Sequence, residues 1–535
     1  MNLRRLPILA SIAGSLALLS AQVSFDRLLN PNKEPQNWVT YSGSYTSQRH
    51  SQLTQITPAN VRNLELKWVF QQKSIDKDEV TPLVVDGVMY TIQSPNDIVA
   101  LDAATGKQQW IYRHTPDAAA KNCCGRMTRG VAIAGDKLYL AAFDARMIAI
   151  NAKTGKEVWN TPVADPKQGY AFTHAPIIVK DKVIAGPSGG EFGIRGFIAA
   201  WDVESGKEVW RFNTIPGPGE PGNETWSGDS WKHGGGAVWA TGSYDPETNL
   251  TYWGVGNPGP DWNGDARIGD NLYSCSVIAL DADTGKIKWH YQFSPHNEFD
   301  WDATQVPILA DIEIQGRPRK VMLWANRNGM FYVLDRTSGE FLLGKPFVKV
   351  NWASGFDEKG RPMRVPGIAP SKQGTLVYPG NQGGTNWYSP SFSPRTGLMY
   401  VSTWENSSTT YVKGDEPPEF AEGKGFTGTF PRGGKQGEET YGAVRAIDPQ
   451  TGDKKWDFKM AGFPEAGVLT TASDLLFSGG RDGAFFALDA RTGDQLWSIN
   501  LGPSVTAGPM TYAVNGRQYV SIAVGSSLFT FGLRP

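Results

Sequence analysis

Two adjacent cysteines are the most unusual chemical feature of this sequence. Cys123 and Cys124 lie in the stretch Asn122-Cys-Cys-Gly-Arg-Met-Thr-Arg129, and the third cysteine of the chain is Cys275. Cys275 can pair with only one of the two, which would leave one thiol unpaired. A disulfide between sequence neighbours closes a small strained ring, and such strain invites a functional explanation. Two free or separately paired thiols are the alternative.

An acidic segment is the second group of residues that could do chemistry. Asn297-Glu-Phe-Asp-Trp-Asp302 is rich in the oxygen donors that hard cations prefer. Asp300 and Asp302 share one face if the segment is extended, because side chains alternate along a strand. No cluster of histidine and cysteine indicates zinc, and we interpret His174 and His296 as ordinary loop residues. The alternative for Asp302 is a solvated loop acid.

An internal repeat shows which elements must position these residues. Six times a short hydrophobic run ends in Asp or Asn, with Gly four positions later and Trp eight positions later. The copies are Asp102 to Trp110, Asn151 to Trp159, Asp202 to Trp210, Asp281 to Trp289, Asp448 to Trp456 and Asp489 to Trp497. The Asp-x-x-Thr-Gly core is typical of a tight turn, in which the acid or amide caps its own backbone. The flanking segments, such as 82–90 and 137–143, are predicted to be strands.

The spacing of the repeats sets the size of the structural unit. Asp102 and Asn151 lie 49 residues apart, and Asn151 and Asp202 lie 51 apart, a period that suits a four-stranded β-propeller blade. A weaker copy, Asp335 to Gly339, brings the marked blades to seven, and we place one unmarked blade between 335 and 448. The prediction is an all-β, eight-bladed β-propeller that forms one domain over residues 22–535. Each repeated Trp is predicted to pack between neighbouring blades.

Composition and the first residues predict an exported globular protein. Gly accounts for 61 of 535 residues, as many tight turns require, and the formal charge is −1. No basic stripe occurs, so nucleic acid is not an expected partner. Residues 1–21 resemble a secretory signal, with Arg4 and Arg5 before the apolar run 6–19. That run is too short to predict a membrane span, so the mature chain is expected in the periplasm without one.

Together, the repeats, the adjacent cysteines and several further motifs resemble the methanol/ethanol dehydrogenase family. These are alcohol dehydrogenases that depend on pyrroloquinoline quinone (PQQ), and the resemblance runs from about Trp38 to the end of the chain. In that family the quinone lies in a central funnel between a Trp and a vicinal disulfide. The resemblance implies that Cys123 and Cys124 form this disulfide and that Trp239 is the opposite face. A flat apolar slot suits a tricyclic aromatic cofactor.

The resemblance also implies a rim of polar groups around the quinone. Arg129 matches the family arginine that pairs with a cofactor carboxylate, a role that suits the planar guanidinium. The turn 185–191 resembles the family's cofactor and metal loop, whose glycines let backbone amides approach the ligand. The implied cofactor contacts are Glu79, Cys123, Cys124, Arg129, Thr173, Ser188, Gly189, Gly190, Trp239, Arg327, Asn386 and Trp387.

A metal site follows from the same resemblance. The implied ligands are Glu191, Asn257, Asp300 and Asp302. In the family, Asp at the position of Asp302 is characteristic of enzymes that use a lanthanide, whereas calcium enzymes usually have a small or uncharged residue there. A trivalent ion gains more than a divalent ion from one additional carboxylate. A lanthanide is therefore the favoured metal, and calcium is the alternative.

The implied reaction is the oxidation of a primary alcohol to an aldehyde. Asp300 falls at the family's catalytic base, which takes the hydroxyl proton while hydride passes to PQQ. Arg327, in Ala-Asn-Arg-Asn-Gly329, falls where the family has a cation near the quinone oxygens. A carboxylate beside a metal cation is expected to have a low pKa.

Two departures from the family pattern leave the size of the substrate open. Ala237 replaces a Thr at the cofactor edge, and Glu465-Ala-Gly467 replaces a Trp-Gly-Gly motif, which removes an aromatic side chain. No Cys-x-x-Cys-His motif occurs in the sequence, so electrons are expected to pass to a separate soluble cytochrome c.

Two other functions compete with this interpretation. One is a cofactor-free propeller that acts as a protein-binding scaffold; lipoproteins of that kind need a cysteine just after the signal, whereas the first here is Cys123. The other is a PQQ enzyme that oxidises sugars, which usually lacks the vicinal cysteines. The sequence is compatible with a homodimer and leaves the oligomeric state open.

Overall fold

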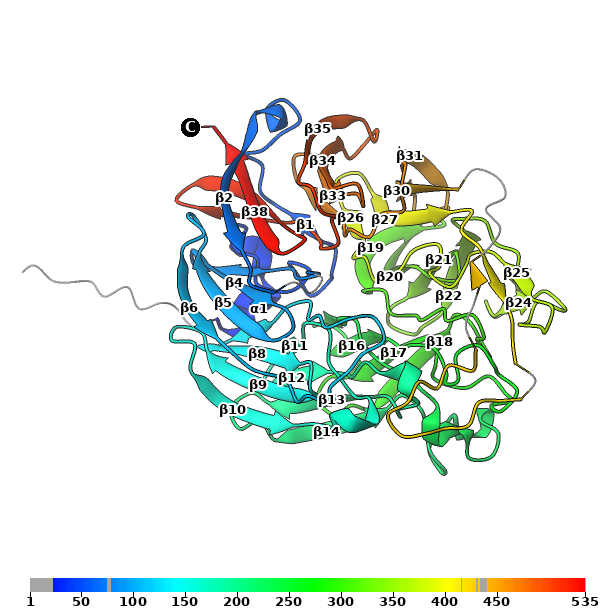
Figure 1. Ribbon diagram of the computed structural model, residues 1–535. Helices are drawn as coiled ribbons and strands as arrows, with labels where there is room; N and C mark the ends of the chain where they lie inside the picture. Colours follow the sequence, from blue (N-terminus) through cyan, green and yellow to red (C-terminus); the bar gives the residue numbers. More distant parts are fainter. Residues whose placement is uncertain (1–22, 75–77, 415, 430–431, 434–439, 535) are drawn as a thin grey trace, which may run out of the picture.

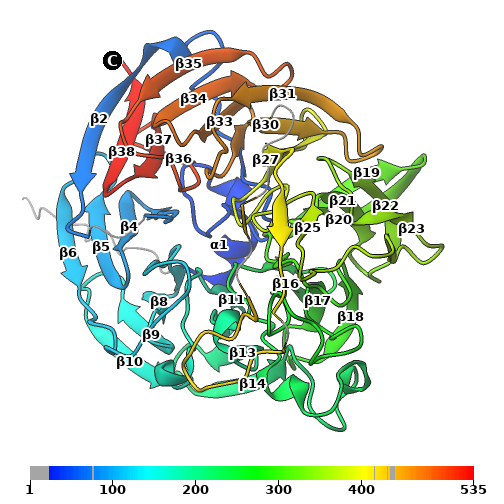
Figure 2. The same ribbon diagram turned by 45° about the vertical axis from the view of Figure 1, so that its right-hand side comes forward.

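The computed structural model describes residues 23–74, 78–414, 416–429, 432–433 and 440–534. The predicted signal segment 1–21 lies outside these residues. Eight antiparallel sheets are arranged as a ring around a central axis, which confirms the predicted eight-bladed propeller (Figure 1). In each blade the strand nearest the axis is followed by strands that lie progressively farther out, as Figure 2 shows for β4, β5 and β6.

Seven blades contain the strands that flank the repeated turns. The first three are β3 (Leu83–Val85), β4 (Val88–Gln93), β5 (Asp97–Asp102) and β6 (Gln108–Tyr112); β7 (Ala132–Ala134), β8 (Lys137–Ala142), β9 (Arg146–Asn151) and β10 (Glu157–Pro162); and β11 (Ile177–Val179), β12 (Lys182–Ala185), β13 (Phe197–Asp202) and β14 (Glu208–Asn213). The fourth and fifth are β15 (Ser243–Asp245), β16 (Leu250–Gly254), β17 (Ser276–Asp281) and β18 (Ile287–Gln292); and β19 (Ile308–Ile314), β20 (Arg317–Ala325), β21 (Met330–Asp335) and β22 (Phe341–Pro346). The sixth and seventh are β26 (Ser391–Ser393), β27 (Leu398–Glu405), β30 (Tyr441–Ile447) and β31 (Lys454–Met460); and β32 (Leu469–Thr471), β33 (Leu475–Gly479), β34 (Ala484–Asp489) and β35 (Gln495–Asn500), to which β1 (His50–Ser51) adds in parallel.

The eighth blade carries no repeat, and its position corrects the sequence prediction. It consists of β36 (Met510–Val514), β37 (Arg517–Val524) and β38 (Ser527–Leu533), with β2 (Leu64–Gln71) as the outer strand. β2 pairs antiparallel with β38, so segments from opposite ends of the sequence close the ring. The predicted location between 335 and 448 was therefore wrong, although the number of blades was right.

The stretch between 335 and 448 instead holds insertions and the start of the sixth blade. The inserted strands are β23 (Ala353–Phe356), β24 (Pro362–Arg364), β25 (Thr375–Val377), β28 (Thr409–Tyr411) and β29 (Arg432–Gly433). The described helices are short, namely α1 (Phe25–Leu29), η1 (Pro31–Lys33), η2 (Val61–Asn63), η3 (Pro166–Gln168), η4 (Gly190–Phe192), η5 (Asn223–Thr225) and η6 (Ser230–His233). Among the described residues, no helix is both long and apolar enough to cross a membrane.

The repeated Trp side chains lie between neighbouring blades, as predicted. The Asp102 carboxylate accepts hydrogen bonds from the backbone N–H and hydroxyl of Thr105, which forms the expected turn. In six blades, the Gly of the corresponding turn packs against a Trp indole of the preceding blade. The closest approach of a Cβ added to the turn glycine would be 2.4 to 2.7 Å in the pairs Gly106 with Trp68, Gly155 with Trp110, Gly206 with Trp159, Gly285 with Trp210, Gly339 with Trp289 and Gly493 with Trp456. Trp68 lies in β2, so the same contact also closes the ring between the eighth and first blades.

This contact makes the turn glycine important for stability. Gly155 has a φ of +68°, and an added Cβ would lie 2.6 Å from the Trp110 ring. Gly135 is a matched control, because its φ is +59° and nothing lies within 4 Å of an added Cβ. Both Ala substitutions incur the backbone cost of a left-handed conformation, but only Gly155→Ala also displaces an indole. We expect Gly155→Ala to lose about 1–3 kcal/mol more unfolding free energy than Gly135→Ala in urea titrations. Equal losses would contradict the docking role.

Candidate active site

Most of the predicted site residues lie in loops that lead into the innermost strands. These loops end near the axis of the ring, so residues far apart in the sequence meet there. A cavity of about 230 Å³ is lined by Glu79, Asn122, Cys123, Cys124, Met127, Arg129, Thr173, Ser188, Gly189, Glu191, Trp239, Asp300, Asp302, Arg327, Gln382, Asn386, Trp387, Tyr388 and Glu465. Contributions come from the loops before β3, β7, β11, β15, β19, β26 and β32 and from turns within the third and fifth blades.

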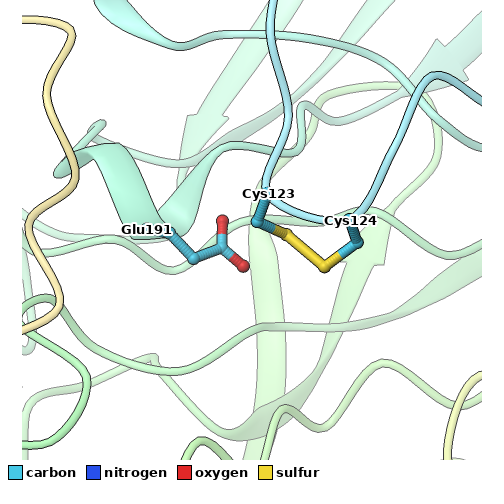
Figure 3. Close-up of side chains that lie close together, drawn as sticks. All are labelled: Cys123, Cys124 and Glu191. Carbon is cyan, nitrogen blue, oxygen red and sulfur yellow. A yellow bond between two sulfur atoms is a disulfide. The ribbon is translucent and has the colours of Figure 1, made fainter. Parts of the chain in front are cut away.

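The two adjacent cysteines form a disulfide on the wall of this cavity. Cys123 and Cys124 are bonded to each other, and Cys275 is a buried free thiol. This pairing removes the alternative of two free or separately paired thiols. The Glu191 carboxylate points toward the disulfide (Figure 3), and one ligand atom from each of the three residues lies within 4.8 Å of the others. Because both sulfurs are oxidised, they are not thiolate ligands.

Arg129 lies between two indoles beside the disulfide loop. Its guanidinium carbon is 5.1 Å from the centre of the Trp239 ring and 4.5 Å from that of Trp387. Nη2 forms an ion pair with Glu79 at 2.7 Å, and Nη1 donates to the Thr173 carbonyl at 3.1 Å. The Arg129 Nε is buried and has no hydrogen-bond partner among the described residues. A buried cation with a spare donor, next to aromatic faces, suits an aromatic anion.

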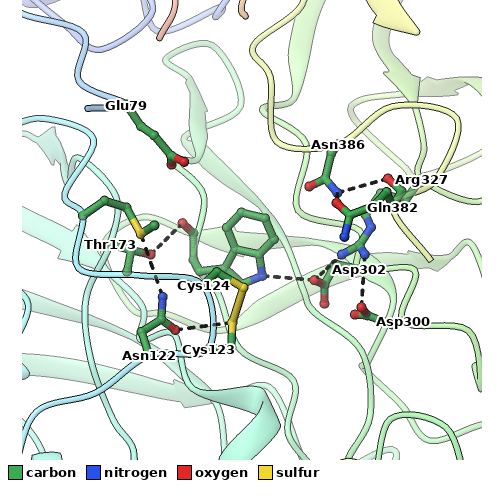
Figure 4. Close-up of a disulfide and its surroundings, with 12 residues drawn as sticks. Glu79, Asn122, Cys123, Cys124, Thr173, Asp300, Asp302, Arg327, Gln382 and Asn386 are labelled. Atoms are coloured by element: carbon green, nitrogen blue, oxygen red, sulfur yellow. Dashed lines mark hydrogen bonds and ion pairs between the residues drawn. A yellow bond between two sulfur atoms is a disulfide. The ribbon is translucent and has the colours of Figure 1, made fainter. Parts of the chain in front are cut away.

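Arg327 holds the acidic segment from the opposite side of the cavity. Its Nη1 is 2.6 Å from Asp302 Oδ2, and its Nη2 is 3.3 Å from Asp300 Oδ2 (Figure 4). Asp302 also accepts hydrogen bonds from the Asn257 backbone N–H at 2.6 Å and from Trp239 Nε1 at 3.3 Å. Asp302 is therefore tied to the predicted cofactor face, to a predicted metal ligand and to Arg327.

Burial dominates the electrostatics of the acids. It raises the pKa of Asp300 well above its usual value; Arg327 opposes this, while Asp302 and Glu191 add to it. Burial and the charge of Asp302 raise the pKa of Glu191 to about 7, and burial also raises the pKa of Asp302. The low pKa expected for Asp300 therefore requires the charge of a bound cation, since the protein's own groups have the opposite net effect.

These acids suit a hard cation. Asp302 is buried, Glu191 and Asp300 are partly buried, and in the described part of the chain Arg327 is the guanidinium that forms ion pairs with the two aspartates. Several buried carboxylates repel one another unless a positive charge compensates them, and oxygen donors are the ligands of calcium and the lanthanides. The indole, disulfide and Arg129 around the same cavity fit a flat polyanionic quinone such as PQQ.

All but two of the predicted site residues line the cavity. The exceptions are Gly190 and Asn257, which contact lining residues or each other: the Asn257 backbone N–H donates to Asp302, and a Cβ on Gly190 would be 3.9 Å from Asn257 Oδ1. Residues not predicted as site residues also line it, namely Asn122, Met127, Gln382, Tyr388 and Glu465. The first four lie within four residues of a predicted site residue. Glu465 belongs to the segment Glu465-Ala-Gly467, where the sequence departs from the family pattern.

The departure at Glu465 changes the polarity of the cavity wall. Glu465 lines the cavity at the place where the resemblance implies an aromatic side chain, and its carboxylate forms an ion pair with Arg481 at 3.4 Å. Burial raises the pKa of Tyr388 well above its usual value, and the charge of Glu465 raises it further. The departure therefore makes this part of the wall more polar.

A propeller whose axial cavity combines a vicinal disulfide, an indole and several carboxylates has the features expected of a quinoprotein, and comparisons with known proteins agree. The family model described as the β-propeller domain of glucose, ethanol and alcohol dehydrogenases, labelled PQQ, matches residues 38–351 and 460–520. The chain belongs to this family of PQQ-dependent alcohol dehydrogenases.

Named relatives and a solved structure are similar over most of the chain. Quinohemoprotein alcohol dehydrogenase ADH IIB of Pseudomonas putida is 40% identical, over 98% of this chain and 78% of its own. The 1-butanol dehydrogenase (cytochrome c) of Thauera butanivorans is 38% identical, over 91% of this chain and 74% of its own. The structure of a europium-containing methanol dehydrogenase is 33% identical and superposes with a TM-score of 0.87, covering 95% of this chain and all of that one. Family membership sets aside the cofactor-free scaffold.

Proposed function

We propose that this protein oxidises primary alcohols to aldehydes in the periplasm, with PQQ and a lanthanide ion bound in the axial cavity. One observation carries the proposal: a single cavity is lined by the Cys123–Cys124 disulfide, Trp239, Arg129 and the acids Glu191, Asp300 and Asp302. The first three suit an aromatic polyanion and the acids suit a hard cation. Bound PQQ would supply a two-electron acceptor for hydride, and the cation would supply Lewis acidity.

The aromatic side of the cavity would hold and orient the quinone. Trp239 and the disulfide would cover its two faces and exclude water, and Arg129 would pair with a carboxylate of the cofactor. Arg129 is held for this role by Glu79 and by the Thr173 carbonyl, so its position does not depend on the ligand. Ser188, Gly189, Asn386 and Trp387 complete the rim.

On the acidic side, Asp300 would act as the catalytic base. It would accept the proton of the alcohol hydroxyl as hydride leaves the carbinol carbon, which yields the aldehyde. Arg327 lies 3.3 Å from Asp300 and would stabilise negative charge that develops on the oxygen atoms in the site. Glu191, Asn257, Asp300 and Asp302 would bind the cation. Three carboxylates balance a trivalent ion more closely than a divalent one, which favours a lanthanide over calcium.

A soluble cytochrome c is the electron acceptor that we propose. The name of the Thauera relative specifies cytochrome c, and no Cys-x-x-Cys-His motif occurs in this sequence. Reduced cofactor must return two electrons, and a haem protein accepts them one at a time. The signal-like residues 1–21 support a periplasmic site for this exchange.

Reconstitution with defined cofactors tests the proposed function. The protein is loaded with PQQ plus lanthanum or calcium, and the reduction of an artificial dye is measured with primary alcohols, secondary alcohols and glucose. We expect the highest kcat/KM with a primary alcohol and lanthanum. A preference for glucose would favour the sugar-oxidising alternative, which the family description includes. If the fully loaded protein reduces the dye with none of the alcohols, the proposal is contradicted.

Trp239 provides a separate test of the quinone site. Because Trp239→Ala removes one stacking face, we expect PQQ to bind about 1–3 kcal/mol more weakly, by analogy with aromatic stacking on bases. Titration of the apo-protein with PQQ measures this change. Trp231→Ala is a matched control, because Trp231 stacks with Arg195 and is not part of the cavity lining. If both variants bind PQQ as tightly as the wild type, Trp239 does not contact the quinone.

A further inference from the structure

Glu465 is an acid in the cavity wall to which the proposed reaction assigns no role. It lines the axial cavity at the place where the resemblance implies an aromatic side chain. Two hydrogen bonds from β27 hold the backbone on either side of it. Trp404 Nε1 donates to the Pro464 carbonyl at 2.8 Å, and the Ser402 hydroxyl donates to the Ala466 carbonyl at 2.7 Å. The sixth blade therefore fixes the position of Glu465.

The segment that carries Glu465 runs beside the segment that carries the aromatic edge of the cavity. The Val468 N–H donates to the Ser389 carbonyl at 2.9 Å. Trp387 and Tyr388, which directly precede Ser389, line the cavity together with Glu465. Aromatic surface and a carboxylate thus share this part of the wall. Such a combination suits an alkyl chain that ends in a polar group.

The charged groups of the cavity lining are mostly negative. The acids are Glu79, Glu191, Asp300, Asp302 and Glu465, and the arginines are Arg129 and Arg327. Arg129 pairs with Glu79, and Arg327 pairs with the two aspartates, so neither arginine of the lining pairs with Glu465. A group that approaches Glu465 therefore meets a hydrogen-bond acceptor and a negative charge. This favours a donor and disfavours an anion.

The ion pair of Glu465 leaves its carboxylate open to competition. Its partner Arg481 is not part of the cavity lining, and the side chain of Arg481 is 49% exposed. Water screens such a pair, so it contributes little stability. A hydrogen-bond donor inside the cavity can therefore compete with Arg481 for the carboxylate.

We propose that Glu465 binds a second hydrogen-bond donor of the substrate, so that the preferred substrates are primary alcohols with a remote hydroxyl or ammonium group. This inference rests on the proposed function, because it takes the axial cavity as the place where the alcohol is oxidised. The alkyl chain would contact Trp387 and Tyr388 while the donor reaches Glu465. Alcohols with a carboxylate in place of the donor would be poor substrates, since Glu465 would repel them.

Alcohols of equal size test this proposal on the protein loaded with PQQ and lanthanum. 1-Pentanol, 1,4-butanediol, 4-amino-1-butanol and 3-hydroxypropanoate have the same number of non-hydrogen atoms and differ in the group at the far end. We expect the diol or the amino alcohol to have a higher kcat/KM than 1-pentanol, and 3-hydroxypropanoate to have the lowest. A preference for either donor supports the proposal and identifies the donor as hydroxyl or ammonium.

Two substitutions of Glu465 separate hydrogen bonding from charge. Glu465→Leu removes the acceptor, so we expect the kcat/KM of the preferred donor substrate, relative to 1-pentanol, to fall by about 10–100-fold. Glu465→Gln keeps a neutral acceptor and should reduce the ratio less for the diol than for the amino alcohol. Asp482→Asn is the matched control, because Asp482 is an exposed acid next to Arg481 and is not part of the cavity lining. It should show the ratios of the wild type.

Arg481→Gln distinguishes substrate binding from a purely structural role of Glu465. If Glu465 binds the donor, Arg481→Gln should keep or increase the preference for the donor substrate, because it removes a competitor. If Glu465 only holds Arg481, then Arg481→Gln and Glu465→Leu should lower Tm alike and leave every kcat/KM ratio unchanged, which would overturn the inference. If the loaded wild type oxidises none of these alcohols, the proposed function itself fails. If it oxidises 1-pentanol as well as the others, only the role of Glu465 is overturned.

Discussion

Asp300→Asn should retain PQQ and lose most of its turnover. The amide keeps the shape of the side chain but cannot accept the hydroxyl proton of the alcohol, so we expect kcat to fall by about 10²–10⁴-fold. Asp300 lines the cavity and is paired with Arg327 at 3.3 Å, which places it on the reacting side of the site. Steady-state dye reduction measures the loss, with PQQ and metal content determined on the same samples.

The metal content decides how this result is interpreted. Because Asp300 is also a proposed metal ligand, a loss of activity counts as evidence for the base only when the variant carries as much metal as the wild type. Asp265→Asn serves as the control, since this acid lies outside the cavity and pairs with Lys413. Near-normal turnover of a fully loaded Asp300→Asn protein would show that another group accepts the proton.

Asp302→Ala should shift the metal preference from lanthanides toward calcium. The substitution removes one carboxylate from the proposed ligand set and leaves Asp300 and the quinone contacts in place. A trivalent ion loses more Coulomb energy than a divalent ion when one negative charge is removed, so we expect the affinity ratio of lanthanum to calcium to fall by at least about tenfold. Competitive metal titration measures this ratio, and reconstituted activity with each ion provides a second readout.

A neutral isostere separates charge from packing at Asp302. The carboxylate also accepts hydrogen bonds from the Asn257 N–H and Trp239 Nε1, so Asp302→Ala removes more than charge. Asp302→Asn retains the shape and should show a similar shift in metal preference. If the wild type is fully active with calcium, and lanthanum brings no gain, Asp302 does not discriminate between the ions.

The fold was predictable where its signals are local in the sequence. Asp102, Gly106 and Trp110 belong to one turn and its following strand, so their spacing alone identifies a blade. The eighth blade has no such turn, because its outer strand β2 lies near the start of the chain and pairs with β38 near its end. That pairing is a tertiary property, so the repeat spacing alone favoured the longest gap between repeats as the position of the unmarked blade.

The candidate site was predictable mainly through the resemblance to a known family. The spacing of Asp300 and Asp302 indicated a shared face, but not that Arg327, in the next blade, bridges them.

A single-turnover experiment tests the central claim most directly. The protein, loaded with PQQ and lanthanum, is mixed without oxygen or dye with a primary alcohol, and the absorbance of the quinone and the aldehyde released are followed together. We predict that the quinone is reduced and that about one aldehyde forms per bound PQQ, more slowly when the carbinol hydrogens are deuterium. A fully loaded protein whose quinone stays oxidised in the presence of every alcohol tested would contradict the account.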